Sequence, residues 1–228
     1  MLLTAVTMGG VALFIAQYLQ IVMSLSPLNA GLWMVPQVFG MITGSILIPV
    51  ISRKTRPGTL IATGLFISAI GMMLLTNTPV TNGIGIVVTG FVISVFGASP
   101  ISILGTGIII GSAPPEKAGT VGSIAETSNQ LGVALGIAIL GSIGAWTYRT
   151  QIVKHFPGSF TNQSIVSIGE SITGAISVAN ALDASNKVSL LLYAKQSFVT
   201  GFHLVAAIGA IVFLGLTFIT AKGLRLVK

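Results

Sequence analysis

Residues 119–144 read GTVGSIAETSNQLGVALGIAILGSIG, an apolar, glycine-rich run with a single ionisable residue, Glu126. A run of this length can cross the hydrocarbon core of a bilayer as one α-helix, which takes about 20 apolar residues. An acid in such a helix is costly to insert, so membrane proteins rarely keep one without a use. The run therefore predicts a membrane-spanning helix with Glu126 as its candidate functional side chain.

The whole chain has the composition of this run. Of its 228 residues, 53% are hydrophobic and only 7% are charged, against roughly a quarter in soluble proteins. The mean hydropathy is +0.97, and 28 residues are glycine. Many glycines among apolar residues are typical of packed transmembrane helices, because small residues let backbones approach. We therefore predict an all-α integral membrane protein.

The formal charge of +7 does not indicate nucleic-acid binding. The basic residues lie at the ends of apolar runs, whereas a nucleic-acid-binding protein gathers them on one soluble face. The sequence has no cysteine, which excludes disulfides and thiolate metal sites. No phosphate-binding loop, dinucleotide-binding motif or metalloprotease motif occurs in a supporting context. We predict a protein that is not an enzyme and that needs no cofactor or metal.

Six apolar runs are long enough to span a bilayer, and turn residues separate them. They lie near residues 3–24, 31–51, 59–77, 83–111, 119–147 and 198–221. Short connections predict that consecutive helices are antiparallel neighbours. The loops after the second and fourth runs are basic, and the turns after the first and third carry no charge. The positive-inside rule then predicts a multi-pass protein of the cell membrane with both termini in the cytoplasm.

The one long connection is residues 149–197, which lie outside the cell on this topology. Its semi-apolar patches are too short to span a bilayer. We expect interfacial helices or a helical hairpin over the extracellular mouth, with a re-entrant segment as the alternative. The predicted organisation is residues 1–148 for the first five helices, 149–197 for this loop, and 198–228 for the sixth helix and a basic cytoplasmic tail.

Three pairs of segments, with their order and spacing, carry a resemblance to a known family. They are QYLQIV (17–22) with LSPLNAGL (25–32), GTVGS (119–123) with NQLG (129–132), and SRKTRPG (52–58) with LIATG (60–64). With the long outer loop, they resemble the fourteen-helix drug:proton antiporters of the major facilitator superfamily, the EmrB/QacA type. The resemblance implies multidrug efflux, the export of hydrophobic or amphipathic compounds in exchange for protons, by a fold of two halves that rock around a central site.

The resemblance covers essentially the whole chain, but only the last six helices of that family. We therefore expect a carboxy-terminal half that needs an amino-terminal half: a fragment, a truncated reading frame or one part of a split transporter. The turn with Arg53, Lys54, Arg56 and Gly58 matches the family's cytoplasmic loop motif but lacks its Asp. A non-transporting remnant and a carrier of another small solute are the alternatives.

In this resemblance Glu126 is the candidate proton-coupling residue. Ser123, Asn129 and Gln130 stand about one helical turn away on the same face. Glu126 is therefore the centre of a polar face, which we expect to be held away from bulk water, and Asn129 and Gln130 are candidate substrate contacts. The alternative is a glutamate that only hydrogen-bonds within the bundle or reaches the inner membrane boundary.

Three membrane glutamines are the remaining candidate substrate contacts: Gln17 and Gln20 in the first run, and Gln37 in the second. Such amides can face a cavity, and they can equally form interhelical hydrogen bonds worth about 1 kcal/mol each. The sequence leaves both open. The predicted partners are protons, small hydrophobic or amphipathic solutes and the lipid bilayer.

Overall fold

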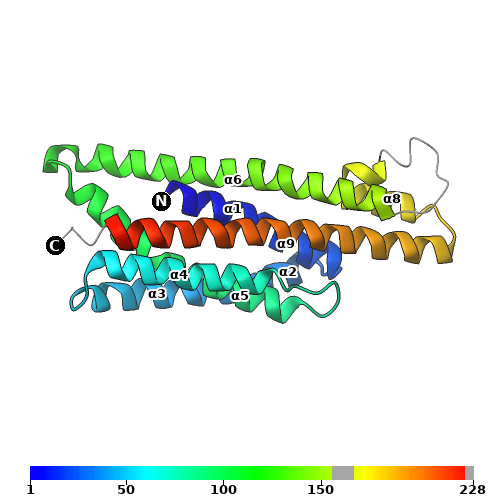
Figure 1. Cartoon of the computed structure of the whole chain (residues 1–228), viewed down its shortest axis with the longest axis horizontal. Helices are drawn as coiled ribbons and strands as arrows, with labels where there is room; N and C mark the ends of the chain where they lie inside the picture. Colours follow the sequence, from blue (N-terminus) through cyan, green and yellow to red (C-terminus); the bar gives the residue numbers. More distant parts are fainter. Residues whose placement is uncertain (156–166, 224–228) are drawn as a thin grey trace.

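The computed structural model describes residues 1–155 and 167–223, and every regular element within them is a helix (Figure 1). Six helical segments are long and apolar enough to cross a membrane: Leu2–Val22, Pro27–Ser52, Pro57–Leu75, Ile84–Gly111, Pro115–Lys154 and Asn186–Gly223. The six predicted spans are thus confirmed, and the chain is a multi-pass membrane protein. Parts of the predicted outer loop (156–166) and of the basic tail (224–228) lie outside the described residues.

The spans are built from α-helices, with one π-helix (η1) and one short 3₁₀ helix (η2). In chain order the elements are α1 (Leu2–Gln17), η1 (Tyr18–Val22), α2 (Pro27–Met34), α3 (Pro36–Ser52), α4 (Pro57–Leu75), α5 (Ile84–Gly111), η2 (Pro115–Lys117), α6 (Ala118–His155), α8 (Ile172–Ala179) and α9 (Ala184–Gly223).

Prolines mark the starts of several helices. α2, α3 and α4 each have proline at the first helical position, where its missing N–H costs no hydrogen bond. At α2 the preceding Ser26 is also an N-cap, because its hydroxyl oxygen accepts a hydrogen bond from the Asn29 amide (3.3 Å). The turn residues in the sequence therefore lie at the starts of α2 and α4, whereas the start of α3 at Pro36 falls inside the run predicted at residues 31–51.

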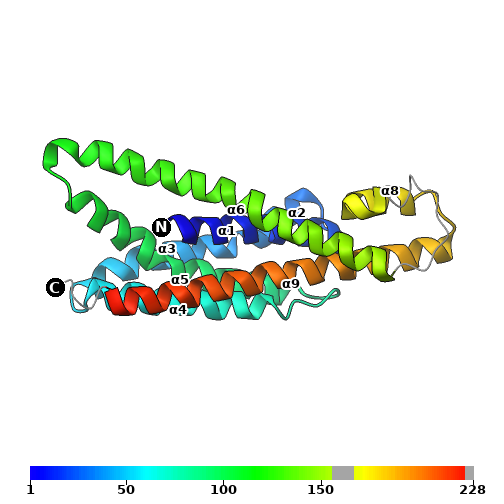
Figure 2. The same ribbon diagram turned by 45° about the horizontal axis from the view of Figure 1, so that its top comes forward.

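Close helix pairs hold the bundle together. α4 packs against α5 and α9, and α1 packs against α6. The α1–α6 seam is the stretch where Gly10 of α1 meets Gly136 and Leu140 of α6 and where Gly136 meets Val6. A Cβ added at Gly136 would collide with the Val6 carbonyl oxygen, so only glycine permits this approach. α6 crosses the bundle obliquely: its first turns stand away from α4, and its later turns lie beside α9 (Figure 2).

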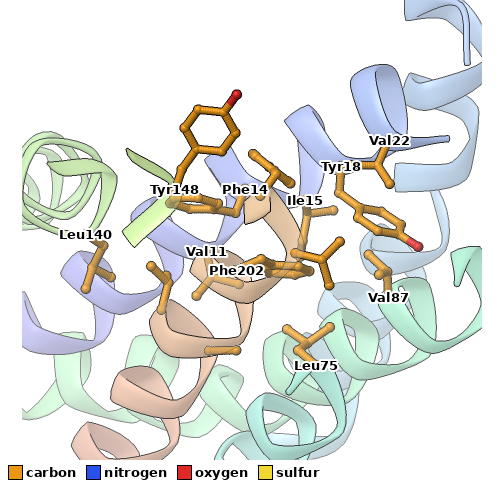
Figure 3. Close-up of a cluster of buried hydrophobic side chains, with 14 of the residues drawn as sticks. Val11, Phe14, Ile15, Tyr18, Val22, Leu75, Val87, Leu140, Tyr148 and Phe202 are labelled. Carbon is orange, nitrogen blue, oxygen red and sulfur yellow. The ribbon is translucent and has the colours of Figure 1, made fainter. Parts of the chain in front are cut away.

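The buried core is centred on α1 and α9, as Figure 3 shows. The rings of Phe14 and Phe202 stack with centroids 6.2 Å apart and an interplanar angle of 4°. Tyr18 is fully buried next to them, and its hydroxyl donates a hydrogen bond to the Pro79 carbonyl oxygen (2.6 Å). A buried tyrosine hydroxyl needs such a partner. These contacts fix the rotation of α1 against α9.

Two further polar contacts tie α9 to the end of the first span and to the α4–α5 turn. The Lys195 ammonium donates to the carbonyl oxygen of Val22, the last residue of η1 (2.7 Å). His203 donates through Nε2 to the carbonyl oxygen of Thr78, in the α4–α5 turn (2.8 Å). η1 and this turn are therefore both fastened to one face of α9.

The helices extend into the segment that we predicted as an outer loop. α6 continues to His155, α9 begins at Ala184, and α8 packs against α9 between them. The predicted boundaries at 148/149 and 197/198 therefore do not coincide with helix ends. The extra turns are supported by packing between α6 and α9, which a count of apolar residues does not reveal. The position of this segment outside the cell stays a prediction.

Candidate functional site

Part of the bundle surface is not covered by any described helix of this chain. In the span Leu2–Val22, 56% of the most apolar stretch is buried within the bundle. The buried share is only 17% in the span Pro27–Ser52 and 33% in the span Pro115–Lys154. The exposed side chains on α3 and α6 are largely apolar, as Phe39 and Ile124 illustrate. A surface of this kind faces lipid or another protein segment.

A cavity of about 540 Å³, the large cavity, lies between α1, α3, α5 and α6. It occupies the half of the bundle that carries the start of α1 and the turn between α3 and α4. Its wall is mostly apolar, and no charged side chain lines it. The lining includes Met8, Met41, Phe91, Val95, Asn129 and Val133. Its size lies within the range of sites for drug-sized molecules, about 300–1,000 Å³.

Three serines, together with Thr4 and Asn129, give this apolar wall its polar points. Ser45, Ser99 and Ser102 line the large cavity, and each hydroxyl donates to a carbonyl four residues back in its own helix (2.9, 3.1 and 3.3 Å). Each oxygen keeps lone pairs that can accept a further hydrogen bond. The sequence analysis missed these serines. For Ser99 and Ser102 a signal was present in the sequence, since their spacing of three residues places two hydroxyls on one face of an apolar helix.

Glu126 lies on the uncovered face of α6. Its side chain is exposed, and its carboxylate Oε1 accepts a hydrogen bond from Gln130 Nε2 (2.7 Å). No described helix covers this face, so the described part of the chain does not itself bury Glu126, and its proton-coupling role stays a prediction. Asn129, one turn further along, lines the large cavity. The carboxylate thus stands beside the cavity rather than in its wall.

The structure separates the predicted substrate contacts. Asn129 lines the large cavity, and Gln17 lines a second one of about 150 Å³, the small cavity, near the end of α1. Gln20, Gln37 and Gln130 line neither cavity. Of the five amides, only two therefore contact a described hollow, and each contacts a different one.

The predicted cytoplasmic loop motif forms the α3–α4 turn. Arg53, Lys54 and Arg56 are exposed, and the Arg56 carbonyl oxygen accepts the first amide hydrogen bonds of α4. Gly58 is buried, and it shares a hollow with Ala221 near the end of α9. The basic turn and the end of α9 thus lie at the same end of the bundle (Figure 1).

Six membrane-spanning helices, with a drug-sized cavity beside an uncovered face, are consistent with one half of a transporter bundle. Comparison with known proteins gives the family. The model of the Major Facilitator Superfamily matches residues 1–137, and the chain belongs to this superfamily. The predicted superfamily is thus confirmed, while the fourteen-helix subtype stays a prediction.

Several curated relatives are drug-resistance proteins. The multidrug efflux pump LfrA of Mycolicibacterium smegmatis is 30% identical over 224 residues, which are 98% of this chain and 44% of that protein. The tetracenomycin C resistance and export protein of Streptomyces glaucescens is 26% identical over 93% of this chain and 40% of its own length. The methyl viologen resistance protein SmvA of Salmonella typhimurium is 30% identical over 96% of this chain and 45% of its own. The chain spans less than half the length of these relatives.

Proposed function

We propose that this chain is the carboxy-terminal half of a proton-coupled exporter of hydrophobic or amphipathic compounds. The printed activities of its relatives, multidrug efflux and resistance to several different compounds, support export as the function. The length relation supports a half, because each relative carries a further segment of at least equal size. In this proposal the missing half covers the exposed surfaces of α3 and α6.

The observation that carries the proposal is the position of Glu126 beside the large cavity. The cavity wall is apolar with a few hydroxyl groups and Asn129, which suits an uncharged or amphipathic solute. Glu126 is the one acidic residue within the α-helices of the six spans, since Glu116 lies in the short 3₁₀ helix η2 before α6 and Asp183 precedes α9. A carboxyl group one turn from the cavity wall is placed to exchange a proton as solute enters or leaves.

The hydrogen bond to Gln130 gives this exchange a structural consequence. A charged carboxylate is the stronger acceptor, so protonation of Glu126 weakens its bond from Gln130 Nε2. The amide is then free to turn along the uncovered face towards a solute or a partner helix. Gln17, Gln20 and Gln37 remain proposed substrate contacts along the same pathway.

The orientation of the bundle follows from the same proposal. Arg53, Lys54 and Arg56 lie at the end of the bundle where α9 finishes with Lys222. Basic residues in short loops favour the cytoplasm. Both termini and the large cavity then lie on the cytoplasmic side, and the small cavity lies near the outside.

A chimera tests the function. The amino-terminal part of LfrA, up to the matched region, is joined to this chain and expressed in cells loaded with ethidium. We expect efflux that stops when a protonophore collapses the proton gradient. Glu126→Gln, which keeps the shape and removes the titratable group, should abolish efflux with normal expression, whereas Glu116→Gln, in the exposed turn, should not.

Each result is informative. Unchanged efflux in the Glu126→Gln chimera would end the coupling role of that residue. Efflux by the chain expressed alone would contradict its assignment as a half. A chimera that is expressed and inserted but exports nothing would favour a remnant that has lost transport.

A further inference from the structure

The basic α3–α4 turn carries positive charge that no acid of the described chain balances. Arg53, Lys54 and Arg56 are exposed, and within residues 1–155 and 167–223 none of their side chains has an ion pair or a hydrogen bond. The loop motif that this turn resembles carries an Asp, which is missing here. The charge of the turn is therefore available to a group from outside the described chain.

A fourth cation stands at the same end of the bundle, on α9. The Lys222 ammonium lies 4.3 Å from the centroid of the Phe218 ring, and this ring belongs to a residue that is 61% exposed. Ala221, the neighbour of Lys222, shares a hollow with Gly58, two residues after Arg56. Lys222 and the basic turn thus approach the mouth of one hollow from two helices.

This hollow, the α4–α9 hollow, has a volume of about 340 Å³ and runs between the two helices away from the charged turn. On α4 its wall extends from Gly58 to Phe66, a rise of about 12 Å for an α-helix. Small residues make the room, since Gly58 and Ala62 are buried and Ala221 contributes from α9. The Phe66 side chain is 50% exposed, so the deep end of the hollow is apolar and open to the surroundings.

Hydroxyl groups lie between the charged mouth and the apolar end. The hydroxyls of Thr63 and Thr217 donate to carbonyls of their own helices (3.0 and 2.8 Å), and each oxygen can still accept a hydrogen bond. The Thr59 hydroxyl, nearest the charged turn, has no hydrogen-bond partner within the described ranges and can donate to an anion. The chemistry along the hollow therefore changes from charge to hydroxyl to hydrocarbon.

We propose that the α4–α9 hollow binds one phospholipid with a net negative head group, of the phosphatidylglycerol type. The phosphate meets Arg56, Lys222 and the Thr59 hydroxyl, the glycerol esters lie beside the other threonines, and one acyl chain passes Phe66. Basic residues at a membrane surface attract anionic lipids, and a basic pocket between membrane helices can hold one head group. A zwitterionic lipid gains less, because its own cation stands next to the phosphate.

This lipid site is independent of the proposed transport pathway. No residue of α3 or α6 lines the hollow, so the surfaces proposed for the missing half lie elsewhere. Binding requires neither transport nor Glu126. Only the assignment of the lipid to the cytoplasmic leaflet rests on the proposed orientation.

Lipid binding to the purified full chain in an uncharged maltoside detergent tests the site. The probe is dioleoyl phosphatidylglycerol, and its matched control is dioleoyl phosphatidylcholine, which has the same acyl chains and no net charge. Native mass spectrometry should show one phosphatidylglycerol bound about tenfold more tightly than phosphatidylcholine. Glycerol 3-phosphate, which has no acyl chains, should show no saturable binding. If it bound as tightly as the lipid, the site would belong to free phosphate compounds and the proposal would be overturned.

Single charge removals test the head-group contacts. Arg56→Gln and Lys222→Gln should each weaken phosphatidylglycerol binding about fivefold, as expected for the loss of one basic residue near a membrane surface. Lys117→Gln is the matched control, because it removes an exposed lysine of the α5–α6 turn that does not line the hollow. This variant should bind phosphatidylglycerol like the parent chain.

A bulky side chain tests the hollow itself. Thr63→Trp projects a ring into the hollow from an exposed position and should weaken phosphatidylglycerol binding, with helix content unchanged by circular dichroism. Ile70→Trp adds the same ring at an exposed position of α4 outside the hollow and should bind like the parent chain. Equal binding of the two lipids, equal loss in Lys117→Gln and Arg56→Gln, or full binding by Thr63→Trp would overturn the proposal. Because this assay contains no transport step, its failure leaves the efflux result of the chimera untouched.

Discussion

The two cavities share a pair of helices but offer opposite chemistries. α1 and α6 line both. The wall of the large cavity is mostly apolar, with serine hydroxyls and no charged side chain. The wall of the small cavity includes the rings of Phe14, Tyr148 and Phe198 and the carboxylate of Glu170. The close α1–α6 contact, where glycines bring the backbones together, runs alongside the large cavity and ends before the small one. The residues around each cavity decide what can enter it.

The comparison is sharpest if the two cavities open to opposite sides of the membrane. The chain contains no cysteine, so a cysteine introduced at one position is the only residue that a maleimide can label. Labelling from outside the cell therefore reports which side of the membrane that position faces. Thr55→Cys, in the basic turn, should resist a membrane-impermeant maleimide applied to intact cells, and Asn82→Cys, in the α4–α5 turn, should react fully. The difference should be all-or-none, read by mass-tag gel shift. Labelling of Thr55→Cys from outside would reverse the proposed orientation of both cavities.

A single methyl group in the seam should destabilise the bundle. Gly136→Ala places a Cβ against the Val6 carbonyl oxygen, and overpacking of this kind costs about 1–3 kcal/mol. We expect a lower thermal unfolding temperature in detergent. Gly107→Ala is the matched control, because nothing lies within 4 Å of its added Cβ. Equal unfolding temperatures of the two variants would mean that α1 and α6 can move apart at the seam without loss of stability.

Filling the large cavity should slow export and leave the fold intact. Ser45→Phe projects a ring into the large cavity, where Ser45 is part of the wall. We expect about a tenfold lower rate of ethidium efflux by the chimera, as for a loss of about 1.4 kcal/mol, with the thermal unfolding temperature of the chain unchanged. Ile46→Phe adds a ring to an exposed position that lines neither cavity, and it should export like the parent. A lower unfolding temperature in Ser45→Phe would show that the added ring strains the bundle as a whole.

Hydropathy and turn chemistry were enough to predict the architecture. The six spans, the turns around Pro27 and Pro57, and the superfamily all follow from signals that act within one run of residues. The start of α3 at Pro36 was not predicted, because it lies inside the apolar run at residues 31–51. The ends of α6 and α9 did not follow, because their extra turns depend on packing between two helices that are distant in the sequence. Local patterns predict where a helix can form, and tertiary contacts decide how far it continues.

The candidate site was harder to predict for a similar reason. The polar face around Glu126 was recognised from its spacing, but its exposure depends on a surface that this chain does not supply. The serines of the large cavity were missed because each makes an ordinary hydrogen bond within its own helix. Glu170 was not singled out, since its relation to Gln17 arises only when the segment before α8 folds back onto α1.

The π-helix at the end of the first span lies between Gln17, which lines the small cavity, and the end of the span, and it turns Gln20 to a different side of the helix. The Met23 amide bonds to the carbonyl oxygen of Tyr18, five residues back, so this turn holds one residue more than an α-turn. The extra residue in this turn changes the direction in which each later side chain points from the helix axis. A helical wheel drawn at a constant value of about 3.6 residues per turn would therefore misassign the faces beyond Tyr18.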